Sequence, residues 1–462
     1  MRNQNGNFRI FRNAAIMLLC MALAILPAVS AGAEQTEDYE YEIAEDGTIG
    51  ITRYNGNETD VTIPAEIDGK PVSVIRTDAF NARSITAVTV PDGVVSIDER
   101  AFANCSGLTS VTLPEGLKKI GNKAFAECVA LTSIRIPDSV TALGDRAFEC
   151  CFALTSANLP ASLSEMGELV FHSCHELCSV TIPEGAVCLG SFAFEWCQQL
   201  TSVTLPDSLV KIESNPFMYS GVTDIIISPD HPVLSYEDGV LFNREEKTLL
   251  LCLALPERSR YTIPEGTETV ADYAFAGCGD MYAISVPDSV VSVFTHSFDC
   301  VNLRLLAISP DHPVYAVIDD VLFRKADKRL IRYPVFRRSA DNELYVVPEG
   351  IRIIGEYAFD DCYDLKAVVI PDSVTTIEDG AFRECQRMKT LEIGNGVTTI
   401  GDHVTDYCSG LQEVTLPASI TSIGQDFLSY SQDVTVTVPR GSYAAQYCEN
   451  MGRTCVLTDP EE

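Results

Sequence analysis

The stretch LTSVTLPEGLKKIGNKAFAEC, which runs from Leu108 to Cys128, decides the fold. A close copy, LTSIRIPDSVTALGDRAFECC, follows from Leu131 to Cys151, and its proline comes 23 residues after the first. A unit this short cannot bury its apolar face alone, so copies must stack into a solenoid whose function lies on a surface. The prolines that mark the register are Pro91, Pro114, Pro137, Pro160, Pro183, Pro206, Pro264, Pro287, Pro348, Pro371 and Pro417, with Gly394 in the remaining slot.

Each unit divides into a strand and a return arm. The first half, residues 108–113, is rich in β-branched residues with a two-residue period and ends at a proline, so it predicts a short strand. The second half, residues 120–125, places apolar residues around a glycine and predicts a turn followed by one helical or 3-10 turn. In a stack, the phenylalanines of the arms form a core spine. The predicted spine comprises Phe80, Phe102, Phe125, Phe148, Phe171, Phe194, Phe217, Phe275, Phe298, Phe359 and Phe382.

The pattern LxxVxLPxxLxxIxxxAFxxC resembles the leucine-rich repeat of the BspA type, also called the Treponema pallidum type, from about Tyr39 to the C-terminus. The resemblance implies an α/β solenoid of leucine-rich repeats, with coils of about 23 residues and a parallel β-sheet on the concave face. It also implies export to the bacterial surface or medium. The role that it implies is adhesion, through binding of host or matrix components.

Two insertions interrupt the period. The segment Ser228-Pro229-Asp230-His231-Pro232-Val233 recurs almost unchanged at residues 309–314. Each copy leads into two apolar runs separated by a charged turn, which predicts a β-hairpin standing off the solenoid. The predicted hairpins span about residues 229–258 and 310–341. Insertions in solenoids gather on one face and often carry contacts, so both hairpins are candidate binding elements.

The N-terminus has the features of a signal peptide. Arg2, Arg9 and Arg12 precede an apolar stretch at residues 14–26, and small residues at 31–33 suit cleavage before Glu34. The apolar stretch is short for a membrane span, and no second stretch of membrane length follows. We therefore expect a secreted or cell-surface protein without stable membrane insertion. The predicted parts are a signal peptide at 1–33, an N-terminal cap at 34–60, the solenoid at 61–440 and a C-terminal cap and tail at 441–462.

The chain is strongly acidic. Its formal net charge is −32 at pH 7, and removal of the three arginines of residues 1–33 makes it about −35. This field excludes binding to nucleic acid or anionic lipid through general charge. One segment, in the second insertion, is locally basic and is a candidate contact for acidic ligands. A hairpin whose long side chains are simply solvated would show the same pattern. Its basic residues are Arg324, Lys325, Lys328, Arg329, Arg332, Arg337 and Arg338.

Seventeen cysteines would ordinarily indicate disulfides in an exported protein. Most of them instead occupy one repeat slot, fourteen residues after the proline or its equivalent, where a buried thiol serves packing. We therefore favour free thiols, with Cys448 and Cys455 outside the column as better disulfide candidates. The column comprises Cys105, Cys128, Cys151, Cys174, Cys197, Cys278, Cys362, Cys385 and Cys408.

No catalytic, cofactor or metal site is predicted. One cluster has residue types that suit zinc: His172, Cys174, His175 and Cys178. However, Cys174 belongs to the cysteine column, and the spacing matches no familiar zinc site. The sequence offers no nucleophile with a base and no phosphate-binding glycine loop. A catalytic site also needs different residues converging on one point, which repetition does not provide.

The outward strand positions are the remaining candidate surface. Two residues before each proline the side chain is mostly threonine, a residue that strands favour for their own sake. Arg135 and Asn158 break this column, and with Ser133 and Ser156 they predict a hydrogen-bonding patch for a protein or glycan. An ice-binding threonine array is an alternative, although Arg135, Glu392 and Val346 would spoil its lattice match. The column comprises Thr62, Thr89, Thr112, Arg135, Asn158, Thr181, Thr204, Thr262, Ser285, Val346, Val369, Glu392, Thr415 and Thr437.

Two classes of function remain open. The first is a non-enzymatic, monomeric binding or adhesion protein that takes an extracellular protein or glycan through the solenoid face and the hairpins. The second is a structural or envelope-spacing protein without a defined ligand. About sixteen strands at ~4.7–4.9 Å each would make an arc on the order of 75 Å long.

Overall fold

Each coil carries two short strands rather than one. The computed structural model describes residues 34–300, 302–334, 344–431 and 433–459, so the predicted signal peptide at 1–33 lies outside the described residues. The first strand of a coil ends next to the repeat proline, and the second lies between the proline and the return arm. Both sets pair in parallel with the neighbouring coils. The solenoid is therefore walled by two kinds of parallel sheet, which we call the long-strand and short-strand sheets.

The long-strand sheets contain the strands that end near the prolines. They are β4 (Asp60–Thr62), β7 (Ala87–Thr89) and β9 (Ser110–Thr112); β11 (Ser133–Arg135), β13 (Ser156–Asn158) and β15 (Ser179–Val180); β17 (Ser202–Thr204) and β19 (Asp224–Ile226); β23 (Arg260–Thr262), β25 (Ala283–Val286) and β27 (Leu305–Ile308); and β31 (Tyr345–Val346), β33 (Ala367–Ile370), β35 (Thr390–Ile393), β37 (Glu413–Thr415), β39 (Thr435–Pro439) and β40 (Cys455–Thr458).

The short-strand sheets run beside them. They contain β6 (Lys70–Ile75), β8 (Ser96–Ile97), β10 (Lys119–Ile120), β12 (Ala142–Leu143), β14 (Glu165–Met166), β16 (Cys188–Leu189) and β18 (Lys211–Ile212); β24 (Thr269–Val270) and β26 (Ser292–Val293); and β32 (Ile353–Ile354), β34 (Thr376–Ile377), β36 (Thr399–Ile400) and β38 (Ser422–Ile423). The two-residue β5 (Glu66–Ile67) pairs with β6.

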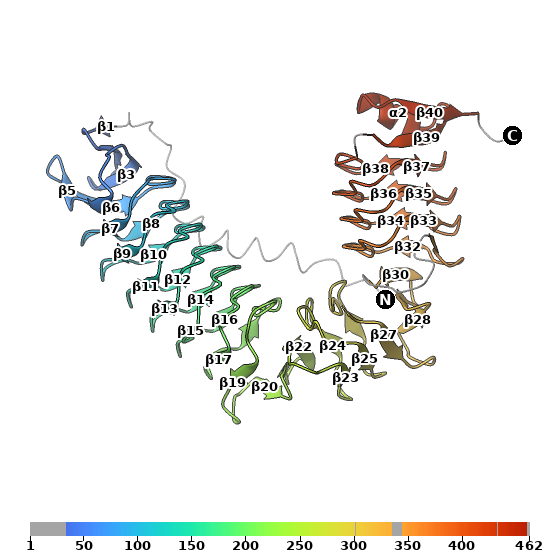
Figure 1. Ribbon diagram of the computed structural model, residues 1–462, viewed down its shortest axis with the longest axis horizontal. Coiled ribbons are helices and arrows are strands. Elements are labelled where there is room, and N and C mark those ends of the chain that lie inside the picture. The colour runs from blue at the N-terminus through green and yellow to red at the C-terminus, as the bar shows by residue number, and fades with distance from the viewer. Residues whose placement is uncertain (1–33, 301, 335–343, 432, 460–462) are drawn as a thin grey trace.

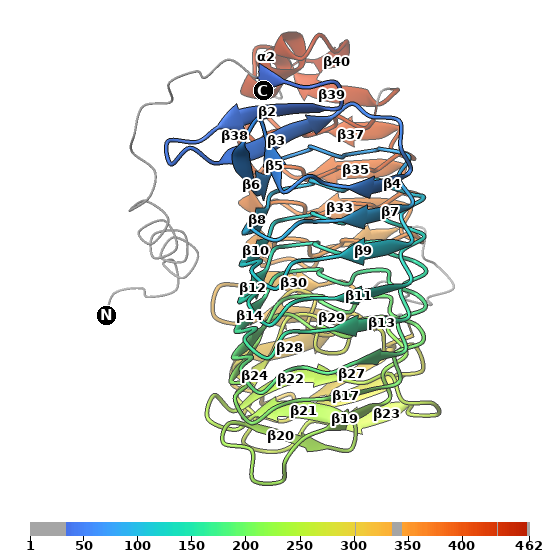
Figure 2. The same cartoon turned by 90° about the vertical axis from the view of Figure 1, so that its left-hand side faces the viewer.

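The solenoid is bent into a V (Figure 1). One side holds β4 to β19, the other holds β31 to β40, and β20 to β30 occupy the bend. In both sides the short strands lie toward the inside of the V, and the long strands lie toward its outside (Figure 1). The parallel sheet expected on the concave face is therefore the short-strand sheet, and the candidate patch lies on the opposite, outer side. Figure 2 shows that outer side, with the two kinds of strand running as adjacent columns.

The return arms are successive turns, so the predicted helical or 3-10 turn is wrong. Lys123 and Glu127 have φ angles of 54° and 60°, and equivalent residues of the other coils share this left-handed conformation. A helix cannot continue through such residues. The arm amides instead donate to the next coil, as Phe125 does to the carbonyl of Ala147 at 2.8 Å. Hydrogen bonds between coils thus replace those within a helix.

The predicted phenylalanine spine is confirmed. Phe125, Phe148 and Phe171 are fully buried, and their rings stack with centroids 5.4 Å apart. Two tyrosines that the repeat pattern did not include extend the spine, because Tyr54 stacks on Phe80 at 5.0 Å and Tyr333 stacks on Phe359 at 5.1 Å. Ring pairs of this kind add ~0.5–1.5 kcal/mol each beyond the burial of their area.

Close approach of the coils explains one glycine column. A Cβ atom on Gly144 would lie 2.6 Å from the backbone of Gly121 and Asn122 in the preceding coil. Only glycine leaves room for that backbone. The repeat glycine after the short strand therefore sets the spacing of the coils as well as the turn.

The insertions do not stand off the solenoid, contrary to the prediction. The first forms the antiparallel strands β20 (Leu234–Glu237), β21 (Val240–Asn243) and β22 (Thr248–Cys252), and β22 pairs in parallel with β24. The second forms β28 (Tyr315–Ile318), β29 (Val321–Arg324) and β30 (Arg329–Arg332), and β30 pairs with β32. Their apolar runs are buried on both faces, as all five residues of β22 are, because each meander continues the short-strand sheet.

The N-terminal segment is built like the insertions. It contains β1 (Glu34–Gln35), β2 (Tyr39–Ile43) and β3 (Ile49–Tyr54), which are antiparallel, and β3 then pairs in parallel with β6. All three meanders end with the same contact, a backbone amide that donates to the alanine carbonyl before the next spine phenylalanine. The bonds are Tyr54 to Ala79 at 2.8 Å, Cys252 to Ala274 at 2.7 Å and Tyr333 to Ala358 at 2.8 Å.

The meanders divide the solenoid into three arrays, each with its own core. The buried apolar residues form clusters that span residues 41–253, 240–331 and 321–448, so neighbouring clusters overlap at the meanders. At the C-terminus α2 (Tyr443–Asn450) covers the last coil and buries Ala444, Ala445 and Cys448. Its N-cap is Ser442, whose hydroxyl accepts a hydrogen bond from the amide of Ala445.

Candidate ligand-binding surface

The residues predicted from the threonine column lie together. Parallel register places Ser133 beside Ser156 and Ser156 beside Ser179, and it places Arg135 beside Asn158. These side chains are exposed, while the alternate residues of the same strands point into the core. The six exposed side chains line a shallow hollow that we call the β11–β15 patch. Its members are Ser133, Arg135, Ser156, Asn158, Ser179 and Thr181.

The patch offers hydrogen-bonding groups rather than an apolar pocket. Arg135 Nη1 lies 2.5 Å from Glu115 Oε1, and this hydrogen bond raises the pKa of the arginine. Both side chains are about two-thirds exposed, so the pair contributes little to stability and its guanidinium can bind other groups. The side-chain amide of Asn158 has no hydrogen-bond partner within the described part of the chain. A flat surface with a guanidinium, an amide and four hydroxyls can bind a polar polymer across several coils.

The basic segment of the second insertion is largely engaged within the protein. Arg324 binds Asp327 through two hydrogen bonds of 2.9 and 2.6 Å, and Arg329 binds Asp327 and Glu378. The Arg324 hydrogen bond outweighs burial and, with Arg329, lowers the pKa of Asp327 to about 2. These arginines therefore act as internal partners of carboxylates.

The other residues of this segment are dispersed. Lys325 Nζ donates to the carbonyls of Pro310 and His312, and Lys328 is exposed. Arg332 is buried, with Nη2 2.9 Å from Asp299 Oδ1, so it cannot contact an external ligand. The last two predicted residues, Arg337 and Arg338, lie outside the described residues.

The repeated Asp-His-Pro motif has a structural role. His231 is fully buried, and its Nδ1 accepts hydrogen bonds from the amides of Val233 and Leu234. The proton therefore lies on Nε2, which is 3.1 Å from the carbonyl of Pro206 and donates to it. His312 makes the same three contacts in the second insertion. Each histidine fastens its meander to the preceding array.

The cysteine column is a ladder of thiols. Cys128 Sγ donates to the carbonyl of Phe102 in the preceding coil at 3.2 Å, and most of the column repeats this bond. Burial raises the pKa of Cys105 to about 11, so its thiol keeps the proton that it donates. Cys300 also belongs to the ladder, through a bond to the carbonyl of Phe275, although its sequence spacing did not indicate it. Cys448 and Cys455, the expected disulfide candidates, are free cysteines.

The four residues that resembled a zinc cluster have other contacts. His172 Nδ1 lies 3.0 Å from Glu195 Oε2, the ring of His175 stacks on Phe152, and the Cys178 thiol donates to the carbonyl of Thr155. Throughout the described ranges, no group of three or more histidine, cysteine or acidic side chains is placed to hold a metal ion. No helix in those ranges has the length and apolarity needed to cross a membrane.

Comparison with known proteins identifies the repeat. A family model described as a BspA type leucine rich repeat region of six copies matches residues 73–186, 166–244, 257–327 and 329–451. Among curated proteins, no significant match to the chain was found.

The chain is also similar to solved structures of leucine-rich repeat proteins. A leucine-rich repeat protein of Treponema pallidum is 34% identical, with a TM-score of 0.39, over 40% of this chain and 88% of that one. One from Bacteroides ovatus is 20% identical, with a TM-score of 0.43, over 92% and 100%. A leucine rich cell surface protein from Faecalibacterium prausnitzii is 26% identical, with a TM-score of 0.37, over 94% and 100%. The family model covers most of the chain. The chain belongs to the BspA type leucine-rich repeat family.

Proposed function

We propose that the protein is an exported, non-enzymatic binding protein that takes an extracellular protein or glycan through its long-strand sheets. The observation that carries the proposal is the β11–β15 patch, where exposed hydroxyl, amide and guanidinium groups from three coils lie in register. A ligand that spans these coils would replace the water on several polar groups at once. Binding across a flat sheet needs no cleft and no conformational change.

The family supports the coarser part of this proposal. A leucine-rich repeat family indicates a role in protein interaction, and proteins of the BspA type are typically exposed at the cell surface. Export of this chain is inferred from residues 1–33, whose basic and apolar pattern is that of a signal peptide. The net charge of −32 favours a partner that is not a nucleic acid. We further propose that the protein acts as a monomer in adhesion to host or matrix components.

A structural role as an envelope spacer is the second candidate. The uniformity of the first array favours it, because its spine phenylalanines are buried alike from Phe80 to Phe194 and stack throughout. Such an array resists local unfolding whether or not it binds anything.

A binding assay on a printed microarray of matrix proteins and glycans separates the two functions. We expect saturable binding of the purified protein to at least one array member, weakened about tenfold or more by the double variant Arg135→Ala and Asn158→Ala. The matched control is Glu392→Ala with Thr415→Ala, two exposed residues in the same register on β35 and β37. The control should bind as the unmodified protein does. Absence of binding to every array member would favour the spacer.

A further inference from the structure

The second array carries an arginine cluster that the sequence did not single out. Arg260 lies on β23, Tyr282 comes just before β25, and Arg304 comes just before β27. The guanidinium carbons of Arg260 and Arg304 each lie 5.8 Å from the centroid of the Tyr282 ring. Arg258 lies over the ring of Tyr261 at 5.6 Å. We call Arg258, Arg260, Tyr282 and Arg304 the β23–β27 arginine cluster.

Its arginines differ from most of the other arginines that the structure describes, because no carboxylate pairs with them. Arg100, Arg146 and Arg324 each bind an aspartate or glutamate within 2.6 Å. Across the part of the chain that the structure describes, Arg258, Arg260 and Arg304 have no such partner. Arg260 and Arg304 are exposed, and Arg258 is half-buried, with Nη1 3.7 Å from the sulfur of Cys252. In a chain with a net charge of −32, guanidinium groups without a carboxylate partner are available to an anionic ligand.

The cluster is held in place by its aromatic ring and by the sheet. The amide of Tyr282 donates to the carbonyl of Ser259 at 2.7 Å, and the amide of Arg304 donates to the carbonyl of Tyr282 at 3.0 Å. Contact with a ring face orders a guanidinium but leaves its N–H edges free. Those edges match the two oxygens of a carboxylate or a sulfate. Since β23 and β27 are two strands apart, the two exposed arginines start about 10 Å apart.

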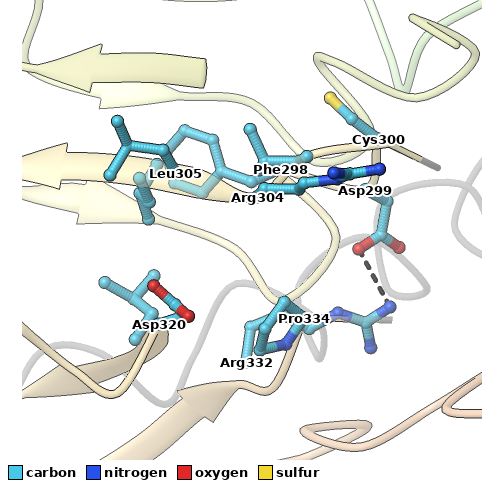
Figure 3. A pocket seen from close by; sticks show the side chains of 11 residues that line it. Phe298, Asp299, Cys300, Arg304, Leu305, Asp320, Arg332 and Pro334 are labelled. Atoms are coloured by element: carbon cyan, nitrogen blue, oxygen red, sulfur yellow. Dashed lines mark ion pairs between the residues drawn. The ribbon is translucent and has the colours of Figure 1, made fainter. Parts of the chain in front are cut away.

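The surface continues into hollows on either side. One is lined by Arg258 and Asp280 together with apolar residues such as Leu255 and Met281. The other has Phe298, Arg304 and Leu305 on one side and Asp320, Arg332 and Pro334 on the other (Figure 3). Hydroxyls also lie beside the cluster, because Thr262 is exposed on β23 and Ser285 is its register neighbour on β25. The exposed surface around the cluster therefore carries separated guanidinium groups, hydroxyl groups and shallow hollows with apolar side chains.

We propose that the β23–β27 arginine cluster binds an anionic polysaccharide, with carboxylate or sulfate groups on Arg260 and Arg304 and sugar hydroxyls on Thr262 and Ser285. The row of cationic groups crosses successive strands, so the polymer runs along the solenoid axis. An acidic peptide would satisfy the arginines but would leave the neighbouring hydroxyls without sugar partners. The proposal names a ligand class and a site that are separate from the β11–β15 patch.

Binding of the purified protein to polygalacturonate and chondroitin sulfate tests this inference, with dextran as the neutral polymer and poly-glutamate as the acidic peptide. We expect saturable binding to at least one anionic polysaccharide, and none to dextran. The double variant Arg260→Gln and Arg304→Gln should bind about tenfold or more weakly. Arg260→Lys with Arg304→Lys keeps the positive charge but loses the planar guanidinium that binds two oxygens at once. Its affinity should lie between those of the unmodified protein and the Gln variant. Added salt should weaken binding because these groups are exposed.

Arg100→Gln with Arg146→Gln is the matched control, since it removes the same charge from arginines that are already paired. This control should leave binding within about twofold, since paired surface charges contribute little. The patch variant Arg135→Ala with Asn158→Ala is measured in parallel. The proposal is overturned if neither anionic polysaccharide binds, if the Gln variant binds unchanged, or if poly-glutamate binds as tightly. Loss of binding only in the patch variant would support the proposed function while refuting this site. Circular dichroism of each variant establishes that it is folded.

Discussion

Replacing Arg332 by Gln should loosen the junction between the second and third arrays. Arg332 ends the second meander, with Nη2 2.9 Å from Asp299 Oδ1 in the second array. The alignment is too poor for a hydrogen bond from this atom, so the contact is an ion pair. Its Nη1 donates to the carbonyl of Tyr357 in the third array at 2.8 Å. One side chain therefore connects an array to the next.

The burial of the pair sets the size of the effect. The side chains of Arg332 and Asp299 are 8% and 18% exposed, so solvent screens them little. Removing one partner of such a pair costs about 3–5 kcal/mol, because the other charge stays buried without compensation. Burial already raises the pKa of Asp299, against the lowering effect of Arg332. In the variant the carboxyl takes up a proton more readily, which keeps the cost within that range.

Hydrogen exchange measures the effect where it should occur. The arrays need not unfold together, so the free energy of opening is read from amides at residues 294–299 and 355–360 rather than from a global transition. A cost of ~3–5 kcal/mol corresponds to exchange about 100- to 4,000-fold faster. Amides of the first array, such as that of Phe125, should be unaffected.

Two variants guard the interpretation. Lys325→Gln removes a charge from an exposed residue of the same meander and should cost less than ~1 kcal/mol. Asp299→Asn added to Arg332→Gln removes both charges and should recover part of the loss, as expected for a coupled pair. If Arg332→Gln left junction exchange within a factor of about three of the unmodified protein, the ion pair would not hold the arrays together.

Two further predictions concern the junction and the coil spacing. Burial lowers the pKa of His296, but contacts with Asp272 and Asp360, and the charge of Asp299 against that of Arg332, raise it on balance to about 9. Since this pKa exceeds the ordinary value of 6.5, the protonated histidine contributes at most ~3 kcal/mol of stability, which is complete below pH 6.5 and is lost as pH rises through 9. His296→Gln should remove this pH dependence of stability from the hydrogen exchange of residues 355–360. An unchanged pH profile in the variant would contradict the prediction. Gly144→Ala should lower the free energy of unfolding by ~1–3 kcal/mol, because the added Cβ would lie 2.6 Å from backbone atoms of the preceding coil. Gly116→Ala, whose Cβ would have no atom within 4 Å, should change stability by less than ~0.5 kcal/mol in the same measurement. Equal effects of the two variants would refute the packing argument.

The repeat itself was predictable from sequence because each slot is sampled many times. The strand before Pro114, the burial of Phe125 and the Cys128 slot follow from the period and from which side chains prefer the core. The same argument placed Arg135 and Asn158 in one register on neighbouring strands, and the structure has them there. Their role in binding stays a prediction.

The errors arose where contacts between distant residues decide the outcome. The left-handed arm residues include Lys123, Glu127 and Trp196, types that do not favour this conformation, so the bonds between coils impose it. Arg332 looked like a surface charge because its partner Asp299 lies in the array before the insertion. The arginine cluster was missed because Arg260 and Arg304 reach the Tyr282 ring only after three coils stack.

The shared ending of the three meanders has a consequence for how such a chain can lengthen. Since each meander supplies a starting strand and the same bond to the first spine alanine, an array is fixed at its beginning and grows from there in steps of one coil. Duplication of one coil extends its own array by about 23 residues and leaves the side chains of the other arrays in their register. Selection can therefore alter the distance between the β11–β15 patch and the β23–β27 arginine cluster without redesigning either surface.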